Sequence, residues 1–145
     1  MIDPVYGCAQ EVGLFVAANI PGETGFHNYN AIGFGWPLVA GVVYHNWNPD
    51  GGVIELSSAS TTRNWLSRAN LKIIFGYPFD ELDCQLCVAR ISEHNTRARR
   101  IWRALGATEY RIPRFYGRNE DVVIATLPVE AWRQFERKVY HRQEI

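Results

Sequence analysis

The chain has 145 residues, of which 47% are hydrophobic and 21% are charged, and its formal net charge is zero. This length fits one domain, so we expect residues 1–145 to form a single domain around a core that needs neither disulfides nor a metal. A neutral chain does not suit a nucleic-acid binder that neutralises many phosphates. No apolar run approaches the roughly 20 residues that span a bilayer, and the N-terminus shows no signal-peptide core. We therefore expect a cytoplasmic protein that binds neither nucleic acid nor a membrane.

Three cysteines are present, Cys8, Cys84 and Cys87. An odd number without an export signal indicates free thiols. Cys84 and Cys87 form one CxxC pair, but a structural zinc site needs a second pair of ligands, and the four histidines have no metal-ligand spacing. We therefore expect packed thiols and no bound metal.

The first part of the chain predicts a helix followed by three strands. Residues 6–20 carry apolar side chains at helical spacing and stop at the breaker pair Pro21-Gly22. Residues 23–29 are polar and turn-rich, which predicts a loop that lies beside a binding site. The strands are expected at residues 31–34, 38–45 and 53–58. A turn at residues 48–52 joins the last two strands into an antiparallel hairpin.

The second part predicts helices that alternate with strands. A helix over residues 63–75 follows a run of Ser and Thr that offers N-caps, and Gly76 stops it. The later elements are a strand, a helix ended by Gly106, a hairpin and a last helix, expected at residues 84–92, 93–104, 108–127 and 128–135. The strand–helix–strand unit over residues 53–92 indicates a parallel pair. We expect an α/β (α+β) fold whose central mixed sheet is mostly antiparallel, has one parallel strand pair and is flanked by helices.

Two segments could bind an anion. The helix expected at residue 63 would present unpaired N–H groups to a phosphate, with Arg63 and Arg68 close by, although hydroxyl residues before a helix are usually only caps. The helix over residues 93–105 has an apolar stripe, and arginines cover much of its remaining surface. That basic surface is either solvated or in contact with a phosphorylated ligand.

Two side chains could act as a general base. Glu55 alternates with Val53 and Ser57 on one face of its strand. If that face lines a cleft, desolvation would favour proton uptake by Glu55. His45 ends the preceding strand and is the second candidate, although a polar residue at a strand end is usually just exposed.

Residues 92–107 carry a recognisable pattern. Asn95 is followed by Ala98 three residues later, by Trp102 seven residues later and then by Leu105-Gly106-Ala107. This spacing resembles the GNAT acetyltransferase superfamily, in which a strand is followed by Asn, Ala, an aromatic residue and Leu-Gly-Phe. The flanking residues resemble the small acetyltransferase-like proteins of phages and prophages, and the resemblance covers roughly residues 31–135.

The resemblance implies a GNAT-like domain that transfers an acetyl group from acetyl-CoA to a primary amine of a small molecule or a protein. Glu55 would be the catalytic residue. The implied cofactor contacts are Leu56, Ser57 and Ser58 for the pantetheine arm, Arg63, Asn64, Trp65, Leu66, Ser67 and Arg68 for the pyrophosphate, and Asn95 and Trp102. A phage-encoded protein would act in the host cytoplasm, and the sequence leaves open whether the chain forms a homodimer.

The sequence departs from the family pattern in three places. Leu66 and Arg68 replace the two glycines of the phosphate loop, and Trp102 replaces the tyrosine that protonates the leaving thiolate. The region before residue 53 is also short. These departures favour an alternative, a catalytically degenerate GNAT-like binding module or a phage structural or accessory protein. A third hypothesis is an unrelated mixed-sheet domain that binds another phosphorylated ligand through its arginine-rich helix.

Overall fold

The computed structural model describes residues 2–140. Over these residues the chain forms seven strands, four α-helices and a π-helical turn. In chain order they are β1 (Pro4–Val5), α1 (Ala9–Ala18), β2 (Asn30–Phe34), β3 (Ala40–Asn48), β4 (Val53–Ser60), α2 (Arg68–Gly76), the π-helical turn (Tyr77–Glu81), β5 (Leu86–Ser92), α3 (Thr96–Leu105), β6 (Thr108–Gly117), β7 (Glu120–Pro128) and α4 (Val129–Tyr140). None of the helices described is long and apolar enough to cross a membrane.

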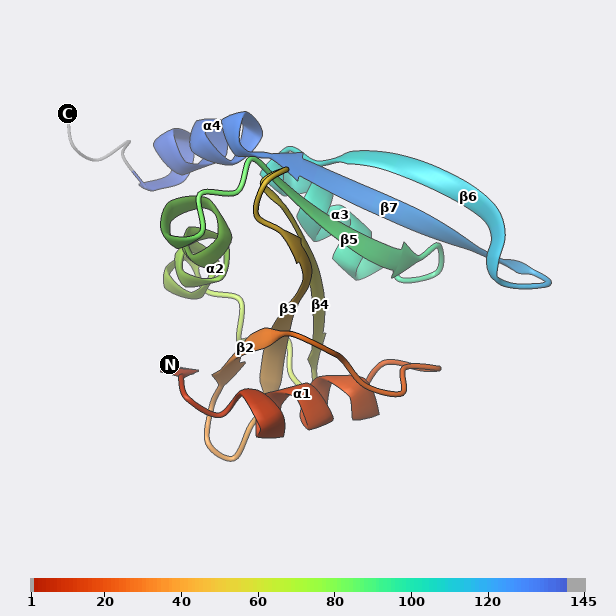
Figure 1. The fold of residues 1–145 in the computed structure, drawn as a ribbon, viewed down its shortest axis with the longest axis horizontal. Helices are drawn as coiled ribbons and strands as arrows, with labels where there is room; N and C mark the ends of the chain where they lie inside the picture. The colour runs from red at the N-terminus through yellow and green to blue at the C-terminus, as the bar shows by residue number, and fades with distance from the viewer. Residues whose placement is uncertain (1, 141–145) are drawn as a thin grey trace.

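All seven strands join one sheet in the order β1-β2-β3-β4-β5-β7-β6 (Figure 1). Every neighbouring pair is antiparallel except β4 and β5, which are parallel. Helix α1 packs on one face of the sheet, and α2, α3 and α4 contribute to a larger core that also contains residues of β3, β4, β5 and β7. This arrangement confirms the expected fold class, a mixed sheet with one parallel pair flanked by helices.

Two glycines let α1 lie directly against the sheet. A Cβ atom on Gly41 of β3 would lie 2.7 Å from Val12 Cγ1, and one on Gly33 of β2 would lie 2.8 Å from Val12 Cγ2. Such contacts are too short for any side chain, so α1 can approach this closely only over glycine. The close packing fixes the end of α1, and with it the loop at residues 19–29, on one side of the sheet.

The larger core is built around Trp132 of α4, which is fully buried. Its indole ring lies 5.1 Å from the Phe75 ring of α2 and 5.6 Å from the Phe135 ring, measured between ring centroids. Phe75 in turn meets Trp102 of α3 edge-on at 5.4 Å. One aromatic cluster therefore ties α2, α3 and α4 together beside the parallel strand pair.

The prediction of a helix over residues 63–75 was wrong at its start. Helix α2 begins at Arg68, because Ser67 is the N-cap and its Oγ accepts a hydrogen bond from Asn70 N at 3.1 Å. Residues 61–67 form a loop instead, and its Trp65 is buried against Phe34. The predicted stop at Gly76 is also too abrupt, since a π-helical turn continues the helical path to Glu81.

Smaller differences concern the ends of the other elements. Strand β1 was not predicted, α1 begins at Ala9, β5 begins at Leu86 and α3 begins at Thr96. The three cysteines are free thiols, as expected, and both members of the CxxC pair are buried. Cys84 precedes β5 and Cys87 lies within it.

Candidate functional site

The parallel strands β4 and β5 separate soon after they meet. Their pairing covers only Val53–Glu55 against Leu86–Val88, whereas β4 continues to Ser60 and β5 to Ser92. Figure 1 shows the two strands diverging beyond the paired segment. A cavity of about 940 Å³, here called the β4–β5 cleft, opens between them. Side chains from both strands, α2, α3, residues 19–23 and the β6–β7 hairpin line this cleft.

The splay leaves part of the β4 backbone without a strand partner. Gly52 O accepts a hydrogen bond from Leu86 N at 3.1 Å, and Thr61 N donates to Val39 O at 2.8 Å. In β4, the backbone N–H and C=O groups of even-numbered residues therefore point toward β5, and those of odd-numbered residues point toward β3. Alternate residues of a strand point their N–H and C=O groups in the same direction. The pairing of Glu55 with Val88 uses the N–H of Leu56, so the open groups are the C=O of Leu56 and both groups of Ser58, which point toward β5 beyond the paired segment.

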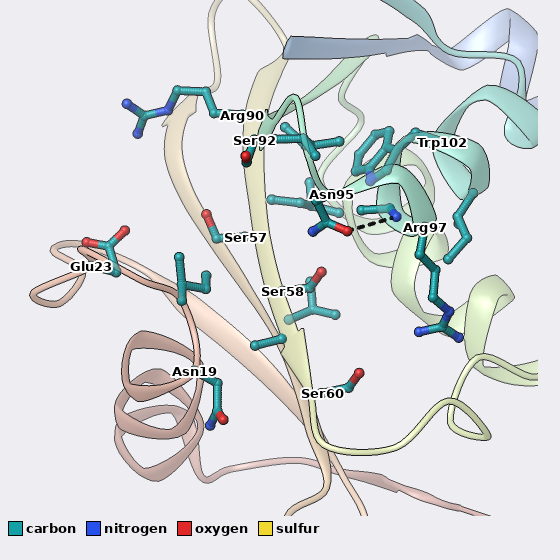
Figure 2. A pocket seen from close by; sticks show the side chains of 18 of the residues that line it. Asn19, Glu23, Ser57, Ser58, Ser60, Arg90, Ser92, Asn95, Arg97 and Trp102 are labelled. Carbon is teal, nitrogen blue, oxygen red and sulfur yellow. Dashed lines mark hydrogen bonds between the residues drawn. The ribbon is translucent and has the colours of Figure 1, made fainter. Parts of the chain in front are cut away.

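One side of the cleft, here called the helical half, faces α2 and α3 (Figure 2). Asn95 is the N-cap of α3, and its Oδ1 accepts a hydrogen bond from Ala98 N at 3.2 Å. The guanidinium of Arg97 donates to Arg63 O at 3.2 Å and has no carboxylate within 4.0 Å among residues 2–140. The helical half therefore carries an unneutralised positive charge.

The opposite side, here called the loop half, faces residues 19–23, and Glu55 lies within it. Glu55 is buried, and its carboxylate accepts a hydrogen bond from Asn46 Nδ2 at 2.8 Å. Its other oxygen accepts from Arg90 Nε at 2.7 Å, which makes a close ion pair. In this arrangement both oxygens of Glu55 have donors, and its charge is balanced by Arg90.

A buried histidine, His45, lies next to Ser57 and Glu55 of the loop half. Burial lowers the pKa of His45, the nearby Glu55 raises it by a smaller amount, and the ring is therefore neutral at neutral pH. His45 Nε2 lies 2.8 Å from Ser57 Oγ, and Asn46 Nδ2, which donates to Glu55, lies 3.3 Å from His45 Nδ1. This network assigns the hydrogen to Nε2, which donates to Ser57. The hydroxyl hydrogen of Ser57 is then available to a group in the cleft.

Tyr116 of β6 adds a phenol to the loop half of the cleft. Burial raises its pKa, and the nearby guanidinium of Arg90 opposes that rise. Tyr116 therefore keeps its proton at neutral pH and can donate it. The sequence pattern did not single out this residue, because its place depends on how the β6–β7 hairpin folds over β5.

The structure brings most of the predicted site residues together. The cleft is lined by Glu55, Leu56, Ser57, Ser58, Trp65, Leu66, Asn95 and Trp102. Four predicted residues do not line it, namely Arg63, Asn64, Ser67 and Arg68. The helix starts later than predicted, so these four residues belong to the loop and to the first turn of α2. The individual roles assigned to these residues stay predictions.

The arginines of α3 have different surroundings: one forms an ion pair with β6, and another lines the cleft. Arg99 forms a two-bond ion pair with Glu109 of β6, with both nitrogen–oxygen distances at 3.0 Å. Arg97 lines the cleft, whereas Arg100 and Arg103 do not. Sequence spacing alone could not separate these roles, since all four arginines lie outside the apolar stripe. Arg90 was also missed, because its contact with Glu55 depends on the β4–β5 register.

Three solved structures are similar in fold to this chain. The spermidine/spermine N-acetyltransferase SpeG from Vibrio cholerae matches with a TM-score of 0.73 at 10% identity, covering 92% of this chain and 98% of that chain. The yncA putative acetyltransferase from Salmonella typhimurium, solved with its cofactor acetyl-CoA, matches with a TM-score of 0.69 at 13% identity over 88% and 94%. A GCN5-related N-acetyltransferase from Brucella melitensis matches with a TM-score of 0.63 at 16% identity over 80% and 59%.

These similarities establish the fold, which is that of the GNAT acetyltransferases. The identities are too low to carry over an activity or a substrate. No family model matches the sequence, and no curated protein matches it. None of the three structures is described as a phage protein, so the expected likeness to phage and prophage acetyltransferases stays a prediction.

Proposed function

We propose that the β4–β5 cleft binds acetyl-CoA and that the protein transfers the acetyl group to a primary amine. The observation that carries this proposal is the unpaired β4 edge formed by the C=O of Leu56 and both backbone groups of Ser58, which opens where β4 and β5 separate. An open strand edge binds an extended, amide-containing chain through backbone hydrogen bonds. The pantetheine arm of acetyl-CoA is such a chain, and a neighbour with this fold is solved with acetyl-CoA.

We place the phosphates of the cofactor at Arg97 rather than along residues 63–68. Arg97 lines the cleft and has no carboxylate partner among residues 2–140, and its guanidinium is suited to paired hydrogen bonds with phosphate oxygens. In the loop, Trp65 is packed into the core and Ser67 is used as a cap. The charge of Arg97 therefore supports phosphate binding despite the missing glycines.

The loop half supplies groups for the transfer step. The amine must be neutral to attack the thioester, and the departing thiolate must receive a proton. Tyr116 is the one tyrosine among the described residues that line the cleft, and it can supply the proton that Trp102 cannot. Ser57, held by His45, offers a hydroxyl hydrogen to the reacting groups. Glu55 can take a proton from the amine only when Arg90 has moved away from its carboxylate.

A second candidate function is acetyl-CoA binding without transfer. The specific observation that favours it is the contact of Glu55 with both Asn46 and Arg90, which leaves no carboxylate oxygen without a donor. In addition, Trp102 stands at the position where the family resemblance expects a tyrosine. A binding module would keep the helical half of the cleft and would need none of the loop half.

The exchange Arg97→Gln tests the cofactor site. We expect it to weaken acetyl-CoA binding roughly tenfold, because it removes a charged donor to the phosphates. The matched control is Arg103→Gln, which removes the same charge from α3 at a position that does not line the cleft. Isothermal calorimetry at two salt concentrations measures both effects, and only Arg97→Gln should also reduce the salt dependence of binding.

Two outcomes would change the proposal. If the wild-type protein does not bind acetyl-CoA at millimolar concentration, the proposed function is wrong. If it binds acetyl-CoA but releases no free CoA thiol with any member of a panel of primary amines, the second candidate is favoured. Thiol release is measured with a thiol-reactive dye, and a reaction without amine measures simple hydrolysis.

A further inference from the structure

The β4–β5 cleft carries opposite charges in its two halves. Arg97 in the helical half has no carboxylate within 4.0 Å among residues 2–140. In the loop half, Glu23 and Glu120 line the cleft and have no cationic partner within that distance over the same residues. Arg90 also lines the loop half, but it is already paired with Glu55 at 2.7 Å. The loop half therefore keeps an excess of negative charge.

Glu23 differs from Glu120 in what surrounds its carboxylate. Ser92 Oγ donates a hydrogen bond to Glu120 at 2.5 Å, which fixes that side chain against β5. Among residues 2–140, the donors to the Glu23 carboxylate are the backbone N–H groups of Thr24 and Gly25, at 3.1 and 3.4 Å. Its negative charge also acts on the pKa values of Arg90 and Tyr116, so it lies in the same electrostatic environment as they do.

The loop half also contains aromatic surface. Phe115 and Tyr116 line the cleft with about half of each residue exposed, and their ring centroids are 5.9 Å apart. Exposed aromatic rings beside carboxylates form a surface that attracts alkylammonium groups, through the ring faces as well as through charge. An anionic acceptor would meet the carboxylates of Glu23 and Glu120 without a free arginine to balance them.

We propose that the acetyl acceptor carries a second cationic group in addition to the reacting amine, and that Glu23 is the residue that selects it. This inference rests on the proposed acetyl transfer and names the class of acceptor for the same cleft. The reacting amine must lose its proton before it attacks, so a carboxylate that stabilises its protonated form does not favour this step. A second ammonium keeps its charge throughout, and Glu23 attracts it from the edge of the cleft.

Three acceptors of equal chain length test this selection: diaminopentane, pentylamine and aminopentanoate. Each has a primary amine at one end, and the other end is a second ammonium, a methyl group or a carboxylate; the kcat/KM of diaminopentane is halved because both of its amines can react. We expect kcat/KM to fall in that order, and the advantage of diaminopentane to shrink as salt is added. Glu23→Gln should lower the ratio of kcat/KM for diaminopentane over pentylamine roughly fivefold. The control Glu11→Gln, at an exposed position of α1 outside the cleft, should leave this ratio unchanged.

The outcomes separate this inference from the proposed function. If pentylamine or aminopentanoate reacts as well as diaminopentane, acetyl transfer stands and selection by charge is overturned. If Glu23→Gln lowers kcat/KM equally for all three acceptors, Glu23 has a structural role and its part in selection is overturned. If none of the acceptors is acetylated by a protein that binds acetyl-CoA, the transfer reaction is overturned together with this inference.

Discussion

Replacing Ser58 with tryptophan is expected to weaken acetyl-CoA binding by roughly 100-fold or more, which corresponds to about 2.7 kcal/mol. Ser58 is exposed because its side chain faces the β4–β5 cleft, so an indole there occupies the space that the pantetheine arm needs. The larger side chain enters open volume rather than packed core, and we expect the free energy of unfolding to change by less than about 1 kcal/mol. Calorimetry measures the affinity, and urea unfolding measures the stability.

The control for this exchange is Ser58→Ala. It leaves the N–H and C=O groups of residue 58 in place and adds no volume, so affinity should stay within about threefold of the wild type. An equally large loss in Ser58→Ala would show that the hydroxyl, rather than the open backbone edge, recognises the cofactor. Full affinity in Ser58→Trp would show that acetyl-CoA binds elsewhere.

Replacing Trp132 with alanine is expected to lower the free energy of unfolding by about 3–5 kcal/mol. Trp132 is fully buried, and its ring contacts Phe75, Phe79 and Phe135, so its removal leaves a cavity at the junction of α2 and α4. Because the same cluster holds Trp102 of α3, we also expect weaker acetyl-CoA binding in the variant. The loss of stability is measured by urea unfolding monitored by circular dichroism.

Trp132→Phe is the matched control. The indole Nε1 is buried without a hydrogen-bond partner in the part of the chain that the structure describes. Phenylalanine removes this unpaired donor while it keeps most of the aromatic contact, so its cost should be less than about 2 kcal/mol. If Trp132→Ala and Trp132→Phe were equally destabilising, a hydrogen bond of the indole, and not the packed volume, would account for the effect.

Much of the fold could be predicted from local sequence patterns. Glycine and proline mark the turn at residues 48–52 and the end of α3 at Gly106, where the backbone adopts a left-handed conformation with a φ of 106°. Ala98, Ile101, Trp102 and Leu105 recur at helical spacing in the sequence, and in α3 Trp102 and Leu105 are buried while Ala98 and Ile101 are partly buried. These features depend on neighbours in the chain, and such neighbours are visible in a sequence.

The start of α2 could not be predicted in the same way. Residues 63–66 are compatible with a helix, but Trp65 gains more by packing against Phe34, thirty-one positions earlier in the chain. Its carbonyl then accepts a hydrogen bond from the side chain of Asn70, which is buried and also donates to Ile2 O. These contacts are tertiary, and they override the local preference for a helix.

The candidate site was predictable only in part, for the same reason. Glu55 and Asn95 were found because strand alternation and a family pattern mark them. Arg90 and Tyr116 were missed, because their contacts depend on the register of β4 with β5 and on the fold of the β6–β7 hairpin. The resemblance to GNAT acetyltransferases predicted the fold, and the structural similarities confirm it.

The most direct test of the central claim, that acetyl-CoA binds along the open edge of β4, is a titration followed by amide NMR. We expect the amide of Ser58, which points toward β5 beyond the paired segment, to shift and gain protection from hydrogen exchange when acetyl-CoA is added. The amides of Glu55 and Ser57 face β3 and should change less. Saturable binding without a change at the amide of Ser58 would contradict the claim.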